Sequence, residues 1–272
     1  MMILLGFTLS GHAQTKRALI ICVGEQQDKD WADLNAENDL QYVRKLLDFC
    51  RYADVSTISG CEATKQGILD EFASLTSRCR KGDIIYIHFS GHGQRMTDIN
   101  SDEIRIKEKD WYDESWIPYD AYMTYCEQDK GEKHLSDDEI AKLLSGIKTK
   151  IGEEGEILVV VDACHSGGST RGDDELYDGL CIRGAEKYFE IPERAEVPST
   201  DIYQVNAECV SPKVGKLTYI LHELRRSLHS MSNDEFLHAV SKMMNSSKFK
   251  APLQQDPTLS EYKCDIKRFF QR

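Results

Sequence analysis

Two apolar runs of similar character dominate the hydrophobic pattern of the chain. Residues 83–89 and 157–161 consist mainly of Ile, Val and other large apolar residues. Continuous apolar runs of this length predict strands that are covered on both faces of a sheet. Each run ends at polar residues and glycines, and parallel strands place such ends at one edge of the sheet. The pattern therefore predicts that His92 and Cys164 lie near each other at that edge.

Further apolar runs predict more strands, and helical patterns separate most of them. Strands that alternate with helices are typical of an α/β fold with right-handed crossovers between parallel strands. We therefore expect a three-layer sandwich around a mostly parallel sheet of six strands. The expected strands are 17–23, 54–58, 83–89, 156–162, 202–207 and 258–263.

The helices are predicted from the spacing of apolar residues and from residues that cap helix N-termini. Thr64, Ser136 and Ser232 each precede an amphipathic segment, and a Ser or Thr side chain at this position accepts a backbone N–H. Ser136 and Ser232 also have a glutamate three positions later, which completes a capping box. The expected helices follow Asp39, Thr64 and Ser136, and two more span about 214–230 and 232–246.

An apolar segment at the N-terminus has two interpretations. Residues 2–9 are mostly apolar, and the small residues Gly11 and Ala13 follow them, as they do before a signal-peptidase cleavage site. We expect residues 1–13 to be the signal peptide of an exported protein, periplasmic or secreted, and residues 14–272 to form the folded domain. The alternative is an apolar N-terminal strand of a cytoplasmic protein.

A segment near the middle of the chain has the character of an exposed linker. Residues 169–200 contain Gly, Asp and Pro and lack a clear period, which is typical of a loop. The linker separates a longer part, residues 14–168, from a shorter part, residues 201–272. Basic residues within it are candidate sites of proteolytic processing. They are Arg171, Arg183, Lys187 and Arg194.

The net charge and the cysteine content restrict the kinds of partner and of cysteine chemistry that the sequence allows. The formal net charge of −12 disfavours nucleic acid and favours cationic substrates. No apolar run is long enough to span a bilayer. The nine cysteines leave two interpretations open, which are disulfides such as Cys50 with Cys61 or small buried thiols. The second is expected for Cys22 and Cys209.

The two expected strand ends supply a base and a thiol, which are the minimum for cysteine nucleophilic catalysis. An imidazole at His92 raises the fraction of thiolate at Cys164, and the thiolate is the reactive form. The backbone N–H groups of Gly93 and Cys164 are candidates for an oxyanion hole. His165 ranks lower as a base, and His88 lies inside a strand, where a core histidine is expected. The alternative is a metal site made of His88, His92, Cys164 and His165.

Two motifs resemble the caspase/metacaspase superfamily of cysteine peptidases, peptidase family C14. They are Ser90-Gly-His-Gly93 and Asp162-Ala-Cys-His-Ser-Gly167. The resemblance covers about residues 17–225 and is closer to metacaspases and their bacterial relatives than to animal caspases. It implies a caspase-like fold, Cys164 as the nucleophile and His92 as the general base. Three shorter segments also match the pattern of the family, at 34–39, 113–120 and 215–219.

The same resemblance implies an acidic pocket for the side chain that precedes the scissile bond. Asp39, Ser90 and Asp162 match the positions that line this pocket in metacaspases, so Arg or Lys is expected there. Elementary electrostatics agrees, because two recessed carboxylates attract a guanidinium or ammonium group. The chain lacks the Gln-Ala-Cys-x-Gly motif of animal caspases, so cleavage after Asp is not expected.

The resemblance also implies calcium binding, through acids that follow the histidine and the cysteine in some metacaspases. The Cys–His chemistry itself requires no cofactor. The sequence leaves two functions open. One is an endopeptidase that cleaves after Arg or Lys and processes its own linker, and the other is a silent pseudo-peptidase that binds peptides or partner proteins. The nearest equivalents of the calcium ligands are Asp98, Asp102, Asp113 and Asp173.

Overall fold

The computed structural model describes most of the chain in ten segments. Structural statements below refer to these segments. They are residues 14–97, 112–124, 126–163, 180–183, 189–190, 202–203, 208–209, 212–246, 257–260 and 264–272.

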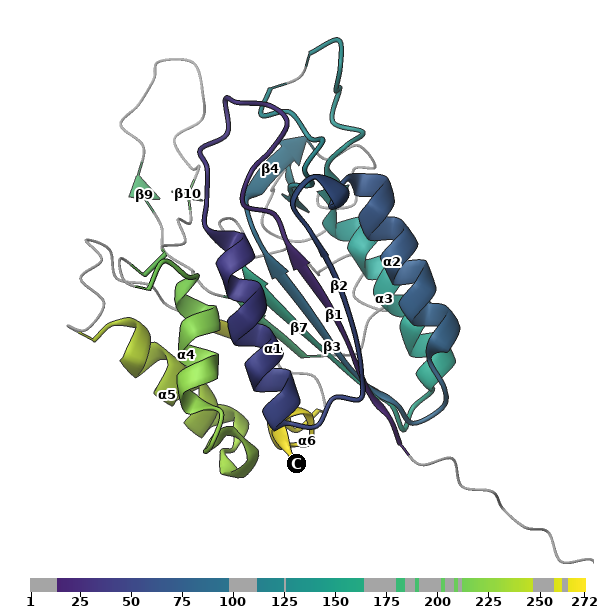
Figure 1. Cartoon of the computed structure of the whole chain (residues 1–272), viewed down its shortest axis with the longest axis vertical. Helices are drawn as coiled ribbons and strands as arrows, with labels where there is room; N and C mark the ends of the chain where they lie inside the picture. The colour runs from purple at the N-terminus through teal and green to yellow at the C-terminus, as the bar shows by residue number, and fades with distance from the viewer. Residues whose placement is uncertain are drawn as a thin grey trace, which may run out of the picture.

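A six-stranded sheet forms the centre of the molecule, as predicted (Figure 1). The strand order is β11-β8-β7-β3-β1-β2, and every neighbouring pair is parallel except β11 with β8. Strands β3 and β7 lie in the interior of the sheet and are buried along their whole length. The strands are β1 Lys16–Cys22, β2 Asp54–Ser59, β3 Ile84–Ser90, β7 Glu156–Asp162, β8 Leu180–Arg183 and β11 Thr258–Ser260.

Helices cover both faces of the sheet and give the predicted three layers (Figure 1). Helices α1 (Asp39–Phe49), α4 (Lys216–Leu224), α5 (Asn233–Met244) and α6 (Ile266–Phe270) share one apolar core with one face of the sheet. Helices α2 (Lys65–Arg78) and α3 (Asp137–Ile151) share a second core with the other face. Successive residues of β1 point to opposite cores, because side chains alternate along a strand. In the described part of the chain, no helix combines the length and apolar character needed to cross a membrane.

The capping residues expected from the sequence begin three of these helices. The Thr64 side chain accepts a hydrogen bond from the Gly67 N–H at the start of α2. Ser136 and Ser232 form complete capping boxes at the start of α3 and α5. These caps are local in sequence, and each supplies an acceptor for an N–H that the helix itself leaves without a partner.

The C-terminal part of the sheet differs from the expectation. Residues 202–203 form β10 (Ile202–Tyr203), which pairs with β9 (Phe189–Glu190) in a separate small sheet. The prediction of a fifth sheet strand at 202–207 was therefore wrong. Strand β8 takes that place, so the expected linker of 169–200 contains one strand of the central sheet. Strand β8 has only four residues, which is too short for a clear period.

The structure also contains several short elements besides the central sheet and its covering helices. The predicted helix at 214–230 divides into α4 and a 3-10 turn, Leu228–Ser230. Two further 3-10 turns span Ala36–Asn38 and Gly60–Glu62. A three-stranded sheet follows β3 and consists of β4 (Gly93–Thr97), β5 (Tyr112–Trp116) and β6 (Leu135–Ser136).

The seven cysteines whose side chains the structure describes are free thiols. Cys50 is buried and Cys61 is exposed, so the disulfide considered between them is not formed. Cys22 and Cys209 are buried, as expected for small apolar side chains. Burial raises the pKa of the Cys50 thiol to about 11, which keeps it protonated and unreactive.

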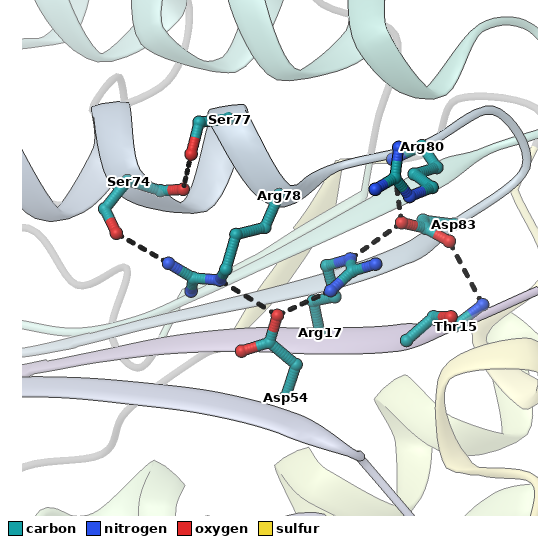
Figure 2. A network of polar contacts seen from close by, with 8 residues as sticks. All are labelled: Thr15, Arg17, Asp54, Ser74, Ser77, Arg78, Arg80 and Asp83. Carbon is teal, nitrogen blue, oxygen red and sulfur yellow. Dashed lines mark hydrogen bonds and ion pairs between the residues drawn. The ribbon is translucent and has the colours of Figure 1, made fainter.

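Arginine–aspartate pairs join three strands at the amino-terminal edge of the sheet (Figure 2). The Arg17 Nη1 lies 2.5 Å from Asp54 Oδ2, and its Nε lies 2.7 Å from Asp83 Oδ2. Arg78 of α2 adds a contact of 3.0 Å to the same Asp54 oxygen. Burial alone would raise the pKa of Asp54, but the hydrogen bonds from Arg78 and Arg17 outweigh it and lower the pKa. The network therefore fixes β1, β2, β3 and α2 relative to one another.

We expect Asp83→Ala to destabilise the protein by about 2–4 kcal/mol, because it leaves a largely buried arginine without one of its partners. Asp83 also accepts hydrogen bonds from the backbone N–H groups of Arg80 and Thr15, at 2.9 and 3.1 Å. Those groups lose their acceptor as well. The measurement is the free energy of unfolding in urea.

An exposed pair provides the control for this prediction. Lys29 and Glu25 are 3.8 Å apart, and their side chains are 71% and 64% exposed. Lys29→Ala should change the free energy of unfolding by less than about 1 kcal/mol. Equal effects of Asp83→Ala and Lys29→Ala would show that the buried network does not stabilise the sheet.

Candidate active site

The pairing of β3 with β7 brings the two predicted catalytic segments together. Ser90 lies opposite Asp162 in the parallel register, and the Gly91 N–H donates to the Asp162 carbonyl at 3.4 Å. His92 is two residues beyond Ser90. Cys164 is two residues beyond Asp162 in sequence but lies outside the described residues. The predicted adjacency of the two strands is confirmed, and both leave the sheet at the same edge.

His92 is half-buried and held by a backbone carbonyl. Its Nε2 lies 2.7 Å from the Ala32 carbonyl oxygen. A carbonyl only accepts, so this contact assigns the ring proton to Nε2 and leaves the lone pair on Nδ1. Burial lowers the pKa of His92, while the contact with Ala32 and the charge of Glu208 oppose that shift. The ring is therefore set up as a neutral base with Nδ1 as its basic atom.

Trp31 covers the ring of His92. The two ring centroids are 4.9 Å apart, with an interplanar angle of 31°. The indole N–H donates to the Ala121 carbonyl at 3.2 Å, and the ring packs in a small apolar cluster with Ile117, Ala121 and Met123. Neighbouring positions of one loop thus hold the face and the edge of the imidazole, which fixes its orientation.

The three residues predicted to line the acidic pocket meet at the same edge of the sheet. Asp39 begins α1, Ser90 ends β3 and Asp162 ends β7. The Ser90 hydroxyl donates to Asp39 Oδ2 at 2.5 Å. Each of the three residues is at most 3% exposed. We refer to Asp39 and Asp162 as the acidic pair.

Helix α4 begins at the acidic pair. The Gly215 N–H donates to Asp39 Oδ1 at 2.8 Å, and the Thr218 N–H donates to Asp162 Oδ2 at 2.9 Å. The Thr218 hydroxyl lies 2.7 Å from the same Asp162 oxygen. Gly215, the N-cap residue, has no side chain to cap the helix, and the two aspartates supply the acceptors instead. The positive end of the α4 dipole also favours a negative charge here.

Burial and mutual repulsion keep the acidic pair from ionising fully. Burial and then the charge of Asp162 raise the pKa of the Asp39 carboxyl to about 8. Hydrogen bonds from Ser90, Gly215 and Thr218 oppose this shift without cancelling it. Two interacting carboxyl groups of this kind share their protons, so the second charge develops only when the pH rises toward 8.

His88 is a core histidine, as predicted, and is fully buried. Its Nδ1 lies 3.2 Å from the Tyr86 hydroxyl, and its Nε2 lies 3.2 Å from the Thr218 hydroxyl. Burial lowers its pKa to about 3. Both ring nitrogens therefore have protein partners, which disfavours the metal site considered for this histidine. Within the described segments, no three His, Cys, Asp or Glu side chains cluster as metal ligands.

The remaining predicted site residues are only partly described. Gly93 directly follows His92 in the sequence. It begins β4 and pairs with Trp116 of β5. Asp113 lies in β5, and its side chain is outside the described residues. Cys164, His165, Asp98, Asp102 and Asp173 lie entirely outside the described residues. The oxyanion hole and the calcium ligands therefore remain predictions.

Glu208 ties the C-terminal part of the chain to the loop that contains Ala32. Its carboxylate accepts from the Asn35 backbone N–H at 2.5 Å and from the Asn35 amide at 2.6 Å. The Asn38 amide donates to the Lys213 carbonyl at 2.8 Å. These contacts, with those of Gly215 and Thr218, dock the C-terminal part beside the candidate site.

Sequence reasoning missed several residues of this site. Trp31, Ala32 and Glu208 act through contacts between distant segments, and no local motif marks them. Gly215 and Thr218 gave a usable signal, because an amphipathic helix that begins without a side-chain cap needs acceptors from elsewhere. The two buried aspartates are those acceptors.

Comparison with known proteins agrees with this geometry. A sequence model of the family described as "Metacaspase, peptidase C14 domain" matches residues 16–171. Metacaspase-1 of Schizosaccharomyces pombe is 28% identical over 152 residues, which are 50% of this chain and 32% of that protein. Metacaspase-1 of Plasmodium falciparum is 35% identical over 106 residues, which are 39% of this chain and 15% of that protein.

Solved structures show the same fold. A protein of Geobacter sulfurreducens matches with a TM-score of 0.61 and 21% identity, over 95% of this chain and 97% of the other. Caspase-1 of Spodoptera frugiperda matches with a TM-score of 0.59 and 11% identity, over 93% and 90% of the two chains. The chain belongs to the metacaspase family and has the caspase-like fold. It spans about a third or less of the length of these curated relatives.

We expect Gly215→Ala to destabilise the protein by about 1–3 kcal/mol, because the new methyl group has no space. A Cβ at this position would lie 2.2 Å from Asp162 Oδ2 and 2.6 Å from Asp39 Oδ2. Either the acidic pair or the start of α4 must then move. Free energies of unfolding in urea measure the effect.

Gly146 in α3 is the matched control, because a Cβ there has no heavy atom within 4 Å. Gly146→Ala should be neutral or stabilise the protein by up to about 1 kcal/mol, since alanine favours a helix. If Gly215→Ala is as well tolerated as Gly146→Ala, the close approach of Gly215 to the acidic pair is not important for stability.

Proposed function

We propose that the protein is a cysteine endopeptidase that cleaves peptide bonds after Arg or Lys. The observation that carries the proposal is the register of β3 with β7. Strand β3 leads to His92, whose ring tautomer is set by the Ala32 carbonyl, and the neighbouring strand β7 leads toward Cys164. Of the acidic pair, Asp162 ends β7 and Asp39 begins α1, where it accepts a hydrogen bond from Ser90 at the end of β3. Membership of the metacaspase family supports the same chemistry.

In the proposed mechanism, His92 Nδ1 takes the proton of the Cys164 thiol. The thiolate then attacks the carbonyl carbon of the scissile bond, and backbone N–H groups of Gly93 and Cys164 stabilise the resulting oxyanion. The imidazolium gives its proton to the leaving amine as the C–N bond breaks. Water, deprotonated by His92, hydrolyses the thioester and regenerates the thiol.

The proposed preference for Arg or Lys follows from the acidic pair. A buried negative charge attracts a guanidinium or ammonium group strongly because little water screens the interaction. The same charge repels an aspartate side chain. The described hydrogen bonds to Asp39 and Asp162 come from N–H and O–H groups. These groups orient the carboxyl oxygens without adding a positive charge.

We expect a fluorogenic peptide that ends in Arg to be cleaved, and one that ends in Asp to be cleaved at least about 100-fold more slowly. Cys164→Ala should reduce cleavage of the Arg peptide by about a thousandfold or more, because it removes the nucleophile. The measurement is kcat/KM for both peptides, with wild type and variant side by side.

The outcomes separate the nucleophile from the specificity. Cleavage of the Asp peptide would contradict the assignment of the acidic pair to the pocket. An inactive wild type whose Cys164 reacts normally with iodoacetamide would contradict the peptidase proposal and favour a peptide-binding role. Each assay is run with added calcium and with a chelator, because calcium binding is proposed on the resemblance alone.

We also propose that the enzyme cleaves its own linker after a basic residue of 169–200. The two fragments should remain associated, because Glu208, Gly215 and Thr218 bond to residues of the N-terminal part. Mass spectrometry of purified wild type should show cleavage after Arg171, Lys187 or Arg194, while Cys164→Ala stays intact. Cleavage after Arg183 is not expected, because this residue ends β8 and pairs within the central sheet. The same spectra report whether residues 1–13 are removed, as proposed for an exported protein.

Processing by another protease would give a different pattern. Cleavage at the same positions in wild type and Cys164→Ala would contradict self-processing. An active wild type that stays full-length would show that processing is not required.

A further inference from the structure

The Thr218 hydroxyl connects three side chains below the candidate pocket. Its Oγ1 lies 2.7 Å from Asp162 Oδ2, 3.2 Å from Asp39 Oδ2 and 3.2 Å from His88 Nε2. Thr218 itself is 2% exposed. These four residues come from four different elements, which are α4, β7, α1 and β3. One hydroxyl therefore links both members of the acidic pair to a buried histidine.

One arrangement of protons is consistent with the described contacts of this network. A hydroxyl donates one hydrogen bond and accepts two. The Thr218 proton belongs with Asp162, which is the nearest acceptor and also accepts the Thr218 backbone N–H. The hydroxyl oxygen then accepts from His88 Nε2–H. Its longer contact with Asp39 Oδ2, at 3.2 Å, favours the ionised form of that carboxyl. The Tyr86 hydroxyl, 3.2 Å from His88 Nδ1, completes the chain as a donor to that nitrogen.

We infer that the acidic pair holds one charge, on Asp162, and one proton, on Asp39, at neutral pH, and that Thr218 and His88 are positioning residues that maintain this division. Recognition of a cationic substrate side chain is then coupled to loss of the Asp39 proton. The inference rests on the proposed function, since it takes the acidic pair to be the pocket for Arg or Lys.

The ionisable groups near Asp39 on other elements are consistent with one charge on Asp162 and one proton on Asp39. His88 is neutral, because burial lowers its pKa to about 3. Cys22 of β1 is a neutral thiol, because burial and the nearby carboxylates raise its pKa well above the ordinary value. Burial and Asp162 raise the pKa of Asp39 itself to about 8.

Lys216 is the basic group that approaches the pair from α4. Its side chain is almost fully buried. Burial lowers its pKa, while attraction to Cys209 and Asp162 opposes the shift. The attraction to Asp162 places a compensating positive charge on the side of the pair where we assign the negative charge.

The test follows the pH dependence of KM and kcat for the Arg peptide between about pH 6 and pH 9.5. For wild type, KM should fall as the pH rises, with a midpoint near 8, because the second carboxylate forms. In Thr218→Val, KM at pH 7 should rise about tenfold or more, because a charge-assisted hydrogen bond is lost. The midpoint should move to higher pH, while kcat stays within about threefold.

Rescue and matched controls distinguish this role from general loss of structure. Thr218→Ser keeps the hydroxyl and should restore both KM and the midpoint. Thr76→Val removes one helix hydroxyl that donates to the Phe72 carbonyl at 2.7 Å, far from the site in sequence, and should change neither value. Tyr86→Phe removes only the outermost hydroxyl of the network. It should raise KM and the midpoint in the same direction by a smaller factor, and it carries the test if Thr218→Val does not fold.

A binding measurement separates this inference from peptidase activity. Agmatine, a small guanidinium compound, is titrated calorimetrically into Cys164→Ala at pH 7 in buffers of different ionisation enthalpy. Binding should release protons in the Cys164→Ala background, and adding Tyr86→Phe should weaken it.

The outcomes are then distinct. Proton-linked binding of agmatine without cleavage of any peptide would uphold the inference and overturn the peptidase proposal. Cleavage of the Arg peptide with unchanged KM and midpoint in Thr218→Val and Tyr86→Phe would overturn the inference alone. If the protein neither cleaves a peptide nor binds agmatine, both the inference and the peptidase proposal are overturned.

Discussion

The parallel register of β3 with β7 is the constraint on which the candidate site depends. Both strands are buried on both faces, and Ser90 lies opposite Asp162. A slip of one residue would turn every side chain of one strand to the other face. The apolar cores on the two sides of the sheet oppose such a slip. The packing of the sheet therefore also aligns Ser90 with Asp162. His92 and Cys164 each follow one of these two residues by two positions in the sequence.

The acidic pair combines a structural role with the proposed recognition role. Asp39 and Asp162 provide the acceptors that begin α4, so they join the N-terminal and C-terminal parts of the chain. Their burial makes full ionisation costly, as the raised pKa of Asp39 indicates. A pocket built from such a pair has a charge that depends on its occupant. A cation that binds there stabilises the second carboxylate and displaces a proton.

The sequence predicts those features that are encoded locally. The buried strands at β3 and β7 follow from continuous apolar runs, and the caps at Thr64, Ser136 and Ser232 follow from residues next to their helices. Strand β8 escapes prediction because four residues carry no clear period. The position of Trp31 was missed, and Thr218 was noticed only within the family pattern at 215–219, without its contacts. Each depends on contacts between segments that only the folded sheet brings together, such as Trp31 with Ala121.

The two edges of the sheet use charge in different ways. At the amino-terminal edge, Arg17 and Arg78 pair with Asp54 and Asp83, so the negative charges there are neutralised within the fold. At the carboxyl-terminal edge, the described hydrogen bonds to Asp39 and Asp162 come from backbone N–H groups and hydroxyls. These donors hold the oxygens in place but neutralise less charge than an arginine does. The first arrangement suits stability. The second leaves a pair of carboxyl groups whose charge changes with protonation, as the proposed recognition of a cationic side chain requires.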